Sequence, residues 1–250
     1  MRGVSFRGNR AIAIATLILA GLATSYVTGR AIPASDEPLA ELSVPDFAGS
    51  RIPTRNTINM LVLGSSLSAR SDWPEVLRDR LQDRLENCAA AGVELRVIAT
   101  GGADSSWGLA QVSGGLDLRP DVVLIEFMIN DADIRNRISR SESLRNHAQM
   151  IDMLRETQPD VAIFLLRLNR AYGPRALLRP SLAGYERLLP DIARRFSVGF
   201  IDLRPGWSDR WRSDGYRSLP DGLHPTDAAA REVNIAKILS TVGGVLQAHC

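Results

Sequence analysis

The sequence predicts a three-layer α/β fold, in which a five-stranded parallel sheet carries helices on both faces. Short, almost continuously apolar runs alternate with longer helical patterns from residue 57 onward. Runs of this kind suit strands that are buried on both faces, and their alternation with helices favours a parallel sheet. We expect the strands at residues 57–63, 94–99, 121–127, 161–168 and 198–203.

Four helices are expected between and after these strands. The first has the clearest signals, because Asp72 and Glu75 have the spacing of a capping box and Pro74 lies in the first turn. Its apolar residues also recur at helical spacing. We expect the helices at residues 73–89, 141–157, 181–196 and 226–241.

The first thirty residues have the pattern of an export signal. Several arginines precede an apolar stretch at residues 11–27. The stretch is shorter than the ~20 residues that a membrane-spanning helix needs, which favours a signal peptide over an uncleaved N-terminal membrane anchor. A buried soluble helix is a further alternative. We therefore expect a periplasmic or secreted bacterial protein, with anchoring to the inner membrane through residues 11–27 as the alternative.

The rest of the chain is expected to form a linker and one domain. Residues 31–56 are rich in proline, serine and acidic residues and have no sustained periodicity, which is typical of a linker. Residues 57–250 then form the domain. The chain has a formal net charge of +2, and this surplus is too small to indicate a nucleic-acid-binding protein.

Polar segments follow the predicted strands where a parallel sheet places its functional sites. Ligands bind beyond the carboxyl ends of the strands in such sheets. The first three strands are followed by GSSLS, TGGADSS and MINDAD, and DGLHPTD precedes the last helix. All four segments are expected at the same edge, where they offer a serine, a base, an acid and backbone donors.

The base is the most constrained choice, because the chain has three histidines. His249 lies in the terminal tail and His147 lies within a predicted helix, whereas His224 lies in a loop at the expected active edge. Asp221 precedes His224 by three residues, so one short turn could present the carboxylate to the imidazole. Taken alone, this spacing does not distinguish a catalytic pair from a helix-capping aspartate next to an incidental surface histidine.

Together, the four segments resemble the sequence blocks of the SGNH hydrolases, also called the GDSL lipase and esterase family. The chain reads GSSL at residues 64–67, where the family has GDS(L), and then ATGG, MIND and DGLH in the family's order. The resemblance covers roughly residues 57–242. It implies a flavodoxin-like domain with serine-dependent hydrolysis of esters.

The resemblance assigns a role to five residues. It implies that Ser66 is the nucleophile, His224 the general base and Asp221 the acid that orients the histidine. The backbone N–H groups of Ser66 and Gly101, with the side-chain amide of Asn130, are expected to form the oxyanion hole. The chain has no His-Cys or paired-His cluster with metal-ligand spacing, and we expect neither a metal nor another cofactor.

The chain departs from the family pattern at three positions. Ser65 replaces the usual aspartate of the first block, Ala99 a common asparagine of the second, and Met128 the glycine of the third. We interpret these changes as alterations of pocket shape and polarity. Asp131 and Asp133 follow Asn130, and they are expected either to bind substrate hydroxyls or to cap a helix or face solvent.

The two cysteines, Cys88 and Cys250, are predicted to form a disulfide, with two free thiols as the alternative. In a flavodoxin-like sheet the first and last helices cover the same face and run away from the active edge. Cys88 follows the first helix and Cys250 the last, so both are expected at the bottom of the domain. An oxidising compartment would let them pair.

These observations favour an exported esterase that removes a short acyl group, acetyl in particular, from a carbohydrate or another small ester. The carbohydrate preference comes from exported bacterial members of the family. Two alternatives are a polysaccharide O-acyltransferase that uses the same residues and a non-catalytic glycan-binding module of the cell envelope. We expect no nucleic-acid partner, and contact with a membrane only through an uncleaved N-terminal segment.

Overall fold

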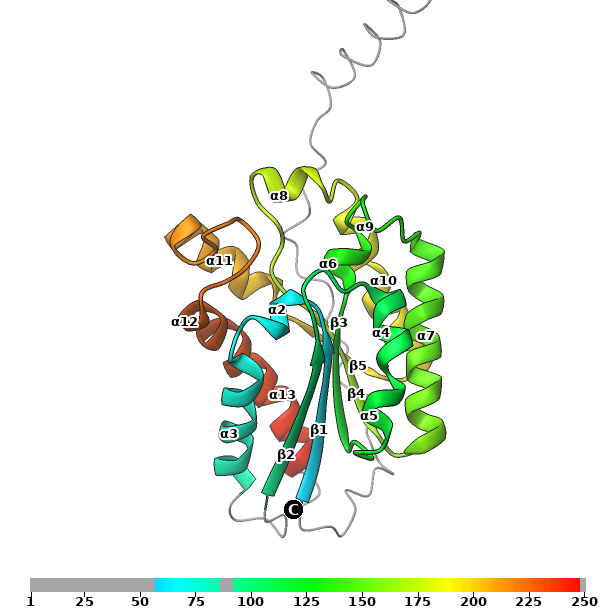
Figure 1. The fold of residues 1–250 in the computed structure, drawn as a ribbon. Coiled ribbons are helices and arrows are strands. Elements are labelled where there is room, and N and C mark those ends of the chain that lie inside the picture. Colours follow the sequence, from blue (N-terminus) through cyan, green and yellow to red (C-terminus); the bar gives the residue numbers. More distant parts are fainter. Residues whose placement is uncertain (1–56, 86–91, 248–250) are drawn as a thin grey trace, which may run out of the picture. The chain divides into compact units, whose positions relative to one another are not determined.

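In the computed structural model, which describes residues 57–85 and 92–247, five parallel strands form a sheet in the order β2-β1-β3-β4-β5 (Figure 1). The strand order and the helices on both faces confirm the predicted fold class. Each strand lies within two residues of its predicted bounds at either end. The strands are β1 (Thr57–Gly64), β2 (Gly92–Ala99), β3 (Val122–Glu126), β4 (Ala162–Arg167) and β5 (Gly199–Asp202).

The apolar character of the strands matches their burial. Every residue of β3 and β4 is buried, because helices cover both faces of the sheet. Alternate side chains of β1 enter different cores: Met60 and Val62 belong to one apolar cluster, Leu61 and Leu63 to the other. The edge strand β2 is mostly half-buried.

Two layers of helices enclose the sheet (Figure 1). On one side, α3 (Trp73–Leu85) packs against α13 (Ala236–Gln247), and α11 (Arg204–Asp214) joins the same apolar cluster through Trp207. On the other side, α7 (Arg140–Thr157) contacts both α4 (Ser105–Gln111) and α10 (Leu188–Phe196). Among the described residues, no helix combines the length and the apolar character that crossing a membrane requires.

Several helices differ from the prediction. The helix expected at 181–196 is divided into α9 (Leu182–Glu186) and α10, and the one expected at 226–241 comprises α12 (Asp227–Ala230), a π-helical turn η2 (Arg231–Ile235) and α13. The sequence patterns also missed α4 and α11. Small or polar residues dominate both segments, so their helical periodicity is weak.

The expected capping box before α3 is replaced by a contact between distant segments. The carboxylate of Asp72 accepts a hydrogen bond of 2.8 Å from Nε of Arg231, on η2. The guanidinium of Arg231 lowers the pKa of Asp72, chiefly through this hydrogen bonding. The contact ties the start of α3 to the segment that precedes α13.

Short helices gather beyond the carboxyl ends of the strands. Figure 1 shows α2, α6 and α8 near this edge of the sheet, where the candidate site lies. Two further short elements, α5 and η1, complete the described structure. The bounds are α2 (Ser66–Ala69), α5 (Ser113–Leu116), α6 (Met128–Asp131), α8 (Pro174–Leu177) and η1 (Gly215–Arg217).

Candidate active site

The register of β2, β1 and β3 brings the loops that follow these strands together. Gly64, at the end of β1, pairs with Ala99 on β2 and with Glu126 on β3. Ser66 and Gly101 each follow this level by two residues, and Asn130 follows it by four. Because neighbouring strands lie about 4.8 Å apart, the three segments share one edge with Ser66 in the middle.

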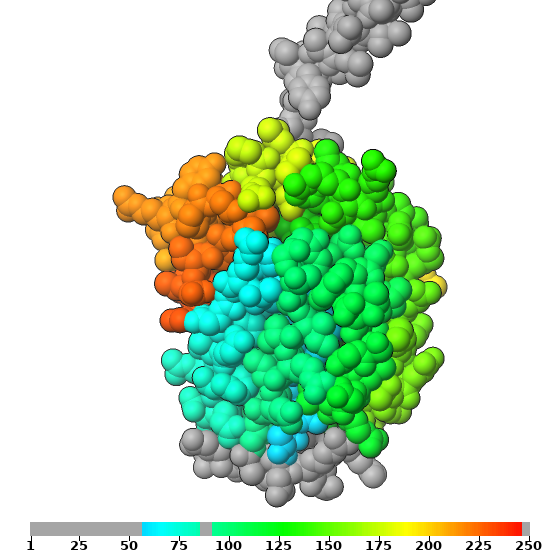
Figure 2. Space-filling model, viewed as in Figure 1, coloured from blue at the N-terminus to red at the C-terminus, as the bar shows by residue number. Residues whose placement is uncertain are grey.

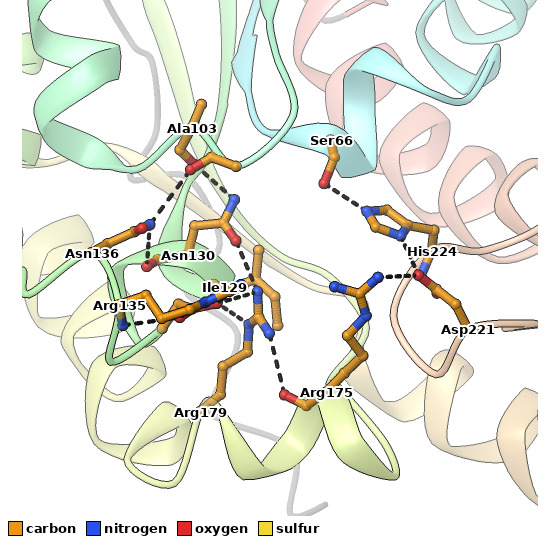
Figure 3. Close-up of polar contacts among 12 residues, drawn as sticks. Ser66, Ala103, Ile129, Asn130, Arg135, Asn136, Arg175, Arg179, Asp221 and His224 are labelled. Atoms are coloured by element: carbon orange, nitrogen blue, oxygen red, sulfur yellow. Dashed lines mark hydrogen bonds and ion pairs between the residues drawn. The ribbon is translucent and has the colours of Figure 1, made fainter.

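Ser66, His224 and Asp221 form a continuous chain of hydrogen bonds (Figure 3). The Ser66 Oγ lies 2.8 Å from Nε2 of His224, and Nδ1 of the same ring lies 2.8 Å from Oδ2 of Asp221. An ionised carboxylate can only accept, so Nδ1 carries the proton and Nε2 accepts from the serine hydroxyl. Figure 2 shows the cyan segment after β1 meeting the orange segment that precedes α12 at the surface.

The Asp221 carboxylate is fixed by four donors. Its Oδ1 accepts from the backbone N–H groups of His224 at 2.8 Å and Leu223 at 3.0 Å. Its Oδ2 accepts from the imidazole and from Nη2 of Arg175, at 3.0 Å. Partial burial acts to raise the pKa of Asp221, but the hydrogen bonds from His224 and Leu223 outweigh it and hold the pKa well below its usual value. The carboxylate is therefore ionised at neutral pH.

A buried glutamate supports the turn that carries Ser66. Oε1 of Glu126 accepts from the Ser65 N–H at 2.6 Å and from the Ser68 hydroxyl at 2.8 Å, and Oε2 accepts from the Ser65 hydroxyl at 2.9 Å. Glu126 is 3% exposed. A Cβ at Gly64 would lie 2.5 Å from Oε1, so this close approach of the carboxylate requires glycine at position 64.

The three expected oxyanion donors occupy different environments. Ser66 is the first residue of α2, so its backbone N–H has no acceptor within the helix. Gly101 is exposed in the turn after β2. Asn130 is buried on α6, and its Nδ2 donates to the carbonyl of Ala103 at 2.9 Å. An amide nitrogen has two hydrogens, so this bond leaves a second one for another acceptor.

The departures from the family pattern lie beneath the surface of the site. Ser65 is 0% exposed and Met128 is 5% exposed. Ser65 contacts Glu126, and Met128 packs in the apolar cluster on the α7 side of the sheet. Met128 also lines a small cavity together with Glu126. The interpretation of these changes as alterations of pocket shape and polarity stays a prediction. Ala99, at the end of β2, is half-buried.

Asp131 and Asp133 are buried and face interior partners, which is inconsistent with binding substrate hydroxyls or facing solvent. Asp131 accepts from the Ser105 N–H at 2.7 Å, and its burial raises its pKa. Asp133 pairs with Arg135 at 2.7 Å and with Arg179 at 2.9 Å. Both acids thus stabilise the loops around the site.

Sequence reasoning missed three residues that touch the candidate site. Glu126 had a detectable signal, because it is a lone acid in an otherwise apolar strand. Arg175 and Arg179 had none, since the chain contains 30 arginines and lysines and nothing local distinguishes these two. Among the described residues, no group of three histidine, cysteine, aspartate or glutamate side chains is placed to hold a metal.

The arrangement is suited to acyl transfer through a serine. The imidazole can take the hydroxyl proton as Ser66 attacks a carbonyl, and the carboxylate can stabilise the imidazolium that forms. Cys88 and Cys250 lie outside the described residues, so the disulfide stays a prediction.

Comparison with known proteins identifies a family and a fold. A sequence model of the GDSL-like Lipase/Acylhydrolase family matches residues 62–231. A search of curated proteins gave no match. Among solved structures, TesA is 21% identical with a TM-score of 0.58, and the match covers 75% of this chain and 99% of TesA. A lipase/acylhydrolase from Enterococcus faecalis is 19% identical with a TM-score of 0.60, covering 75% of this chain and 96% of that one.

A further structural match is a catalytic mutant of an acetylxylan esterase from Geobacillus stearothermophilus. It is 17% identical, has a TM-score of 0.61, and the match covers 74% of this chain and 94% of the esterase. At these identities the solved structures establish a shared fold.

Proposed function

The chain belongs to the GDSL-like lipase/acylhydrolase family of ester hydrolases, and on this premise we propose that it is an exported serine esterase that removes a short acyl group, acetyl in particular, from a carbohydrate ester. The observation that carries the proposal is the hydrogen-bonded chain of Ser66, His224 and Asp221, with 2.8 Å at each of its two side-chain contacts.

In the proposed reaction, Ser66 Oγ attacks the ester carbonyl while Nε2 of His224 takes its proton. The tetrahedral intermediate then collapses, the ester C–O bond breaks, and His224 returns the proton to the departing alcohol. Water attacks the acyl-enzyme with His224 again as the base. Release of the carboxylic acid restores the Ser66 hydroxyl, so no proton or electron is gained or lost by the enzyme.

The oxyanion that forms on the carbonyl needs donors aimed at it. We assign this role to the N–H groups of Ser66 and Gly101 and to Nδ2 of Asn130. The strand register supports the assignment, because it sets the segments of Gly101 and Asn130 on either side of Ser66. Loss of one such donor typically lowers turnover about 100-fold to 1,000-fold.

The substrate class and the location have separate support. The acetylxylan esterase of the same fold supports an acetylated carbohydrate as substrate. The basic and then apolar pattern of residues 1–30 supports export to the periplasm or the cell exterior. An exported enzyme would meet polysaccharide esters directly.

A Ser66→Ala variant tests the proposal. We expect kcat/KM for p-nitrophenyl acetate and for acetylated xylan to fall by at least about 1,000-fold, because the nucleophile is lost. The matched control is Ser240→Ala, which removes an exposed hydroxyl on α13 and is expected to retain wild-type turnover.

Both proteins are then assayed with the acetylated glycan in the presence and absence of an acceptor sugar. Acetate release that depends on Ser66 supports the esterase. Transfer of acetyl to the acceptor in place of release would instead indicate an acyltransferase, and glycan binding without turnover would indicate a binding module.

A further inference from the structure

Arg179 is a buried arginine in the loop after α8, and it reaches α6, the short helix that carries Asn130 (Figure 3). Its side chain is 2% exposed. Nε donates to the Ile129 carbonyl at 2.7 Å, and Nη2 donates to Oδ1 of Asn130 at 3.0 Å. Nη2 also lies 2.9 Å from Oδ2 of Asp133, which supplies a countercharge. One planar guanidinium thus contacts two residues of α6 and one residue of the turn that follows it.

These contacts determine which way the Asn130 amide faces. Oδ1 accepts from Arg179, and Nδ2 donates to the Ala103 carbonyl at 2.9 Å. An amide turned by 180° would set its oxygen against the Ala103 carbonyl and its NH₂ group against the guanidinium. Two hydrogen bonds would become two repulsive contacts in a buried site, so the turned orientation is strongly disfavoured.

The orientation matters because the two ends of an amide have opposite effects on an oxyanion. Nδ2 stabilises the negative charge through its second hydrogen, whereas Oδ1 in the same place would repel it. The contact with Ala103 alone would restrain one end of the amide. The guanidinium restrains the other end, and its anchor on the Ile129 carbonyl sets its own position.

We propose that Arg179 is a positioning residue for acyl transfer, which holds the Asn130 amide with its nitrogen toward the oxyanion. The proposal rests on the proposed function, since it requires Asn130 to be an oxyanion donor. Arg179 acts through Asn130 and does not itself touch the substrate. Its contribution therefore disappears when the Asn130 amide is absent.

A double-mutant cycle measures this dependence. The variants are Arg179→Lys, Asn130→Ala and the combination of both, with p-nitrophenyl acetate as substrate. Lysine keeps the charge opposite Asp133 but cannot reach Ile129, Asn130 and Asp133 at once with a planar fork. Rates are expressed per active site, titrated with a fluorophosphonate that labels Ser66, so that unfolded protein does not lower the apparent kcat.

We expect Asn130→Ala to lower kcat about 100-fold to 1,000-fold and Arg179→Lys to lower it roughly 10-fold to 100-fold, with KM changed by less than about threefold. The double variant should have the kcat of Asn130→Ala. Arg135→Ala is the matched control, because it removes the exposed partner of Asp133 and leaves the contact between Arg179 and Asn130 in place. We expect its kcat to stay within about twofold of wild type.

Two kinetic results would overturn the proposal. One is a wild-type kcat for Arg179→Lys, and the other is a double variant whose loss is the product of the two single losses. Arg179→Met is the second variant if Arg179→Lys does not fold, and failure of both to fold would assign Arg179 a purely structural role. An unchanged kcat in Asn130→Ala would instead contradict the oxyanion role of Asn130 in the proposed function.

Discussion

At the scale of single residues, the acid that holds the turn of Ser66 lies on a neighbouring strand. The family's first block has an aspartate after the glycine, whereas this chain has Ser65 there. The carboxylate that binds the turn comes from Glu126 at the end of β3. Burial raises the pKa of Glu126 to about 7, although its hydrogen bonds from Ser65 and Ser68 act in the opposite direction.

This pKa predicts a specific pH dependence of stability. Below the ordinary pKa of 4.5, Glu126 is protonated in both the folded and the unfolded chain. Between 4.5 and about 7 the unfolded chain loses the proton first, so the free energy of unfolding falls, by at most about 3 kcal/mol, and then stays level. Glu126→Gln removes this loss, because it does not titrate.

The measurement is urea denaturation of both proteins at pH 4.5 and pH 8. From pH 4.5 to pH 8, we expect the free energy of unfolding of Glu126→Gln to rise by about 1–3 kcal/mol relative to that of the wild type. Glu75→Gln, on the exposed face of α3, is the control and should keep the wild-type pH dependence. A difference between Glu126→Gln and wild type that does not change with pH would contradict the prediction.

At the scale of elements, the loop that carries Asp221 and His224 depends on a backbone contact with the segment after β4. The Gly222 carbonyl accepts from the Tyr172 N–H at 2.7 Å, and the Leu223 carbonyl accepts from the Asn169 side chain at the same distance. Gly222 has φ +75°, and a Cβ there would lie 2.5 Å from the Tyr172 carbonyl oxygen. The loop can approach this closely because residue 222 is glycine.

Gly222→Ala should therefore displace the histidine loop. The left-handed backbone conformation alone disfavours alanine by about 1–2 kcal/mol, and the contact with the Tyr172 carbonyl adds to this. We expect a lower melting temperature and a kcat reduced at least about 10-fold, because displacements of about 1 Å at reacting groups are costly.

Gly244→Ala provides the matched comparison for that variant. Gly244 is exposed on α13, and nothing lies within 4 Å of an added Cβ. Alanine favours a helix over glycine by up to about 1 kcal/mol, so this variant should be as stable as wild type or more so, with unchanged kcat. Wild-type kcat in Gly222→Ala would show that the loop tolerates the side chain.

At the scale of the whole molecule, α3 and the last helix, α13, lie on one face of the sheet. Leu81 and Leu85 of α3 share an apolar cluster with Val242 and Leu246 of α13. This adjacency is the premise of the predicted disulfide between the cysteines that follow these helices in sequence. Export would provide the oxidising compartment in which the bond forms.

The disulfide and export are tested on one sample, the protein purified without reductant from the periplasm or medium of a bacterial host. We expect no reactive thiol after denaturation, two after reduction, and an N-terminus downstream of the leader. Reduction should lower the free energy of unfolding by roughly 2–4 kcal/mol, because the cross-link constrains the unfolded chain. Two free thiols in the unreduced sample would exclude the bond between Cys88 and Cys250, and recovery only from the cytosol would contradict export.

The sheet could be predicted from sequence because strands covered on both faces must be apolar along their whole length. That requirement leaves a local signal, and all five strands appear within two residues of their expected bounds. Helices with little apolar periodicity leave no such signal in the sequence. The segments of α4 and α11 were missed for this reason, and the division between α9 and α10 lay within a continuous helical pattern.

The sequence by itself determined the fold class, the family resemblance and the candidates Ser66, Asp221 and His224, because short motifs and a scarcity of histidines are local properties of the chain. Only the tertiary structure decided what supports them. Glu126 contacts Ser65 from 61 positions away, and Arg179 contacts Asn130 from 49. Such contacts depend on which strands and loops become neighbours. In a chain rich in arginine, no local pattern distinguishes Arg179, the arginine that contacts the Asn130 amide, from the others.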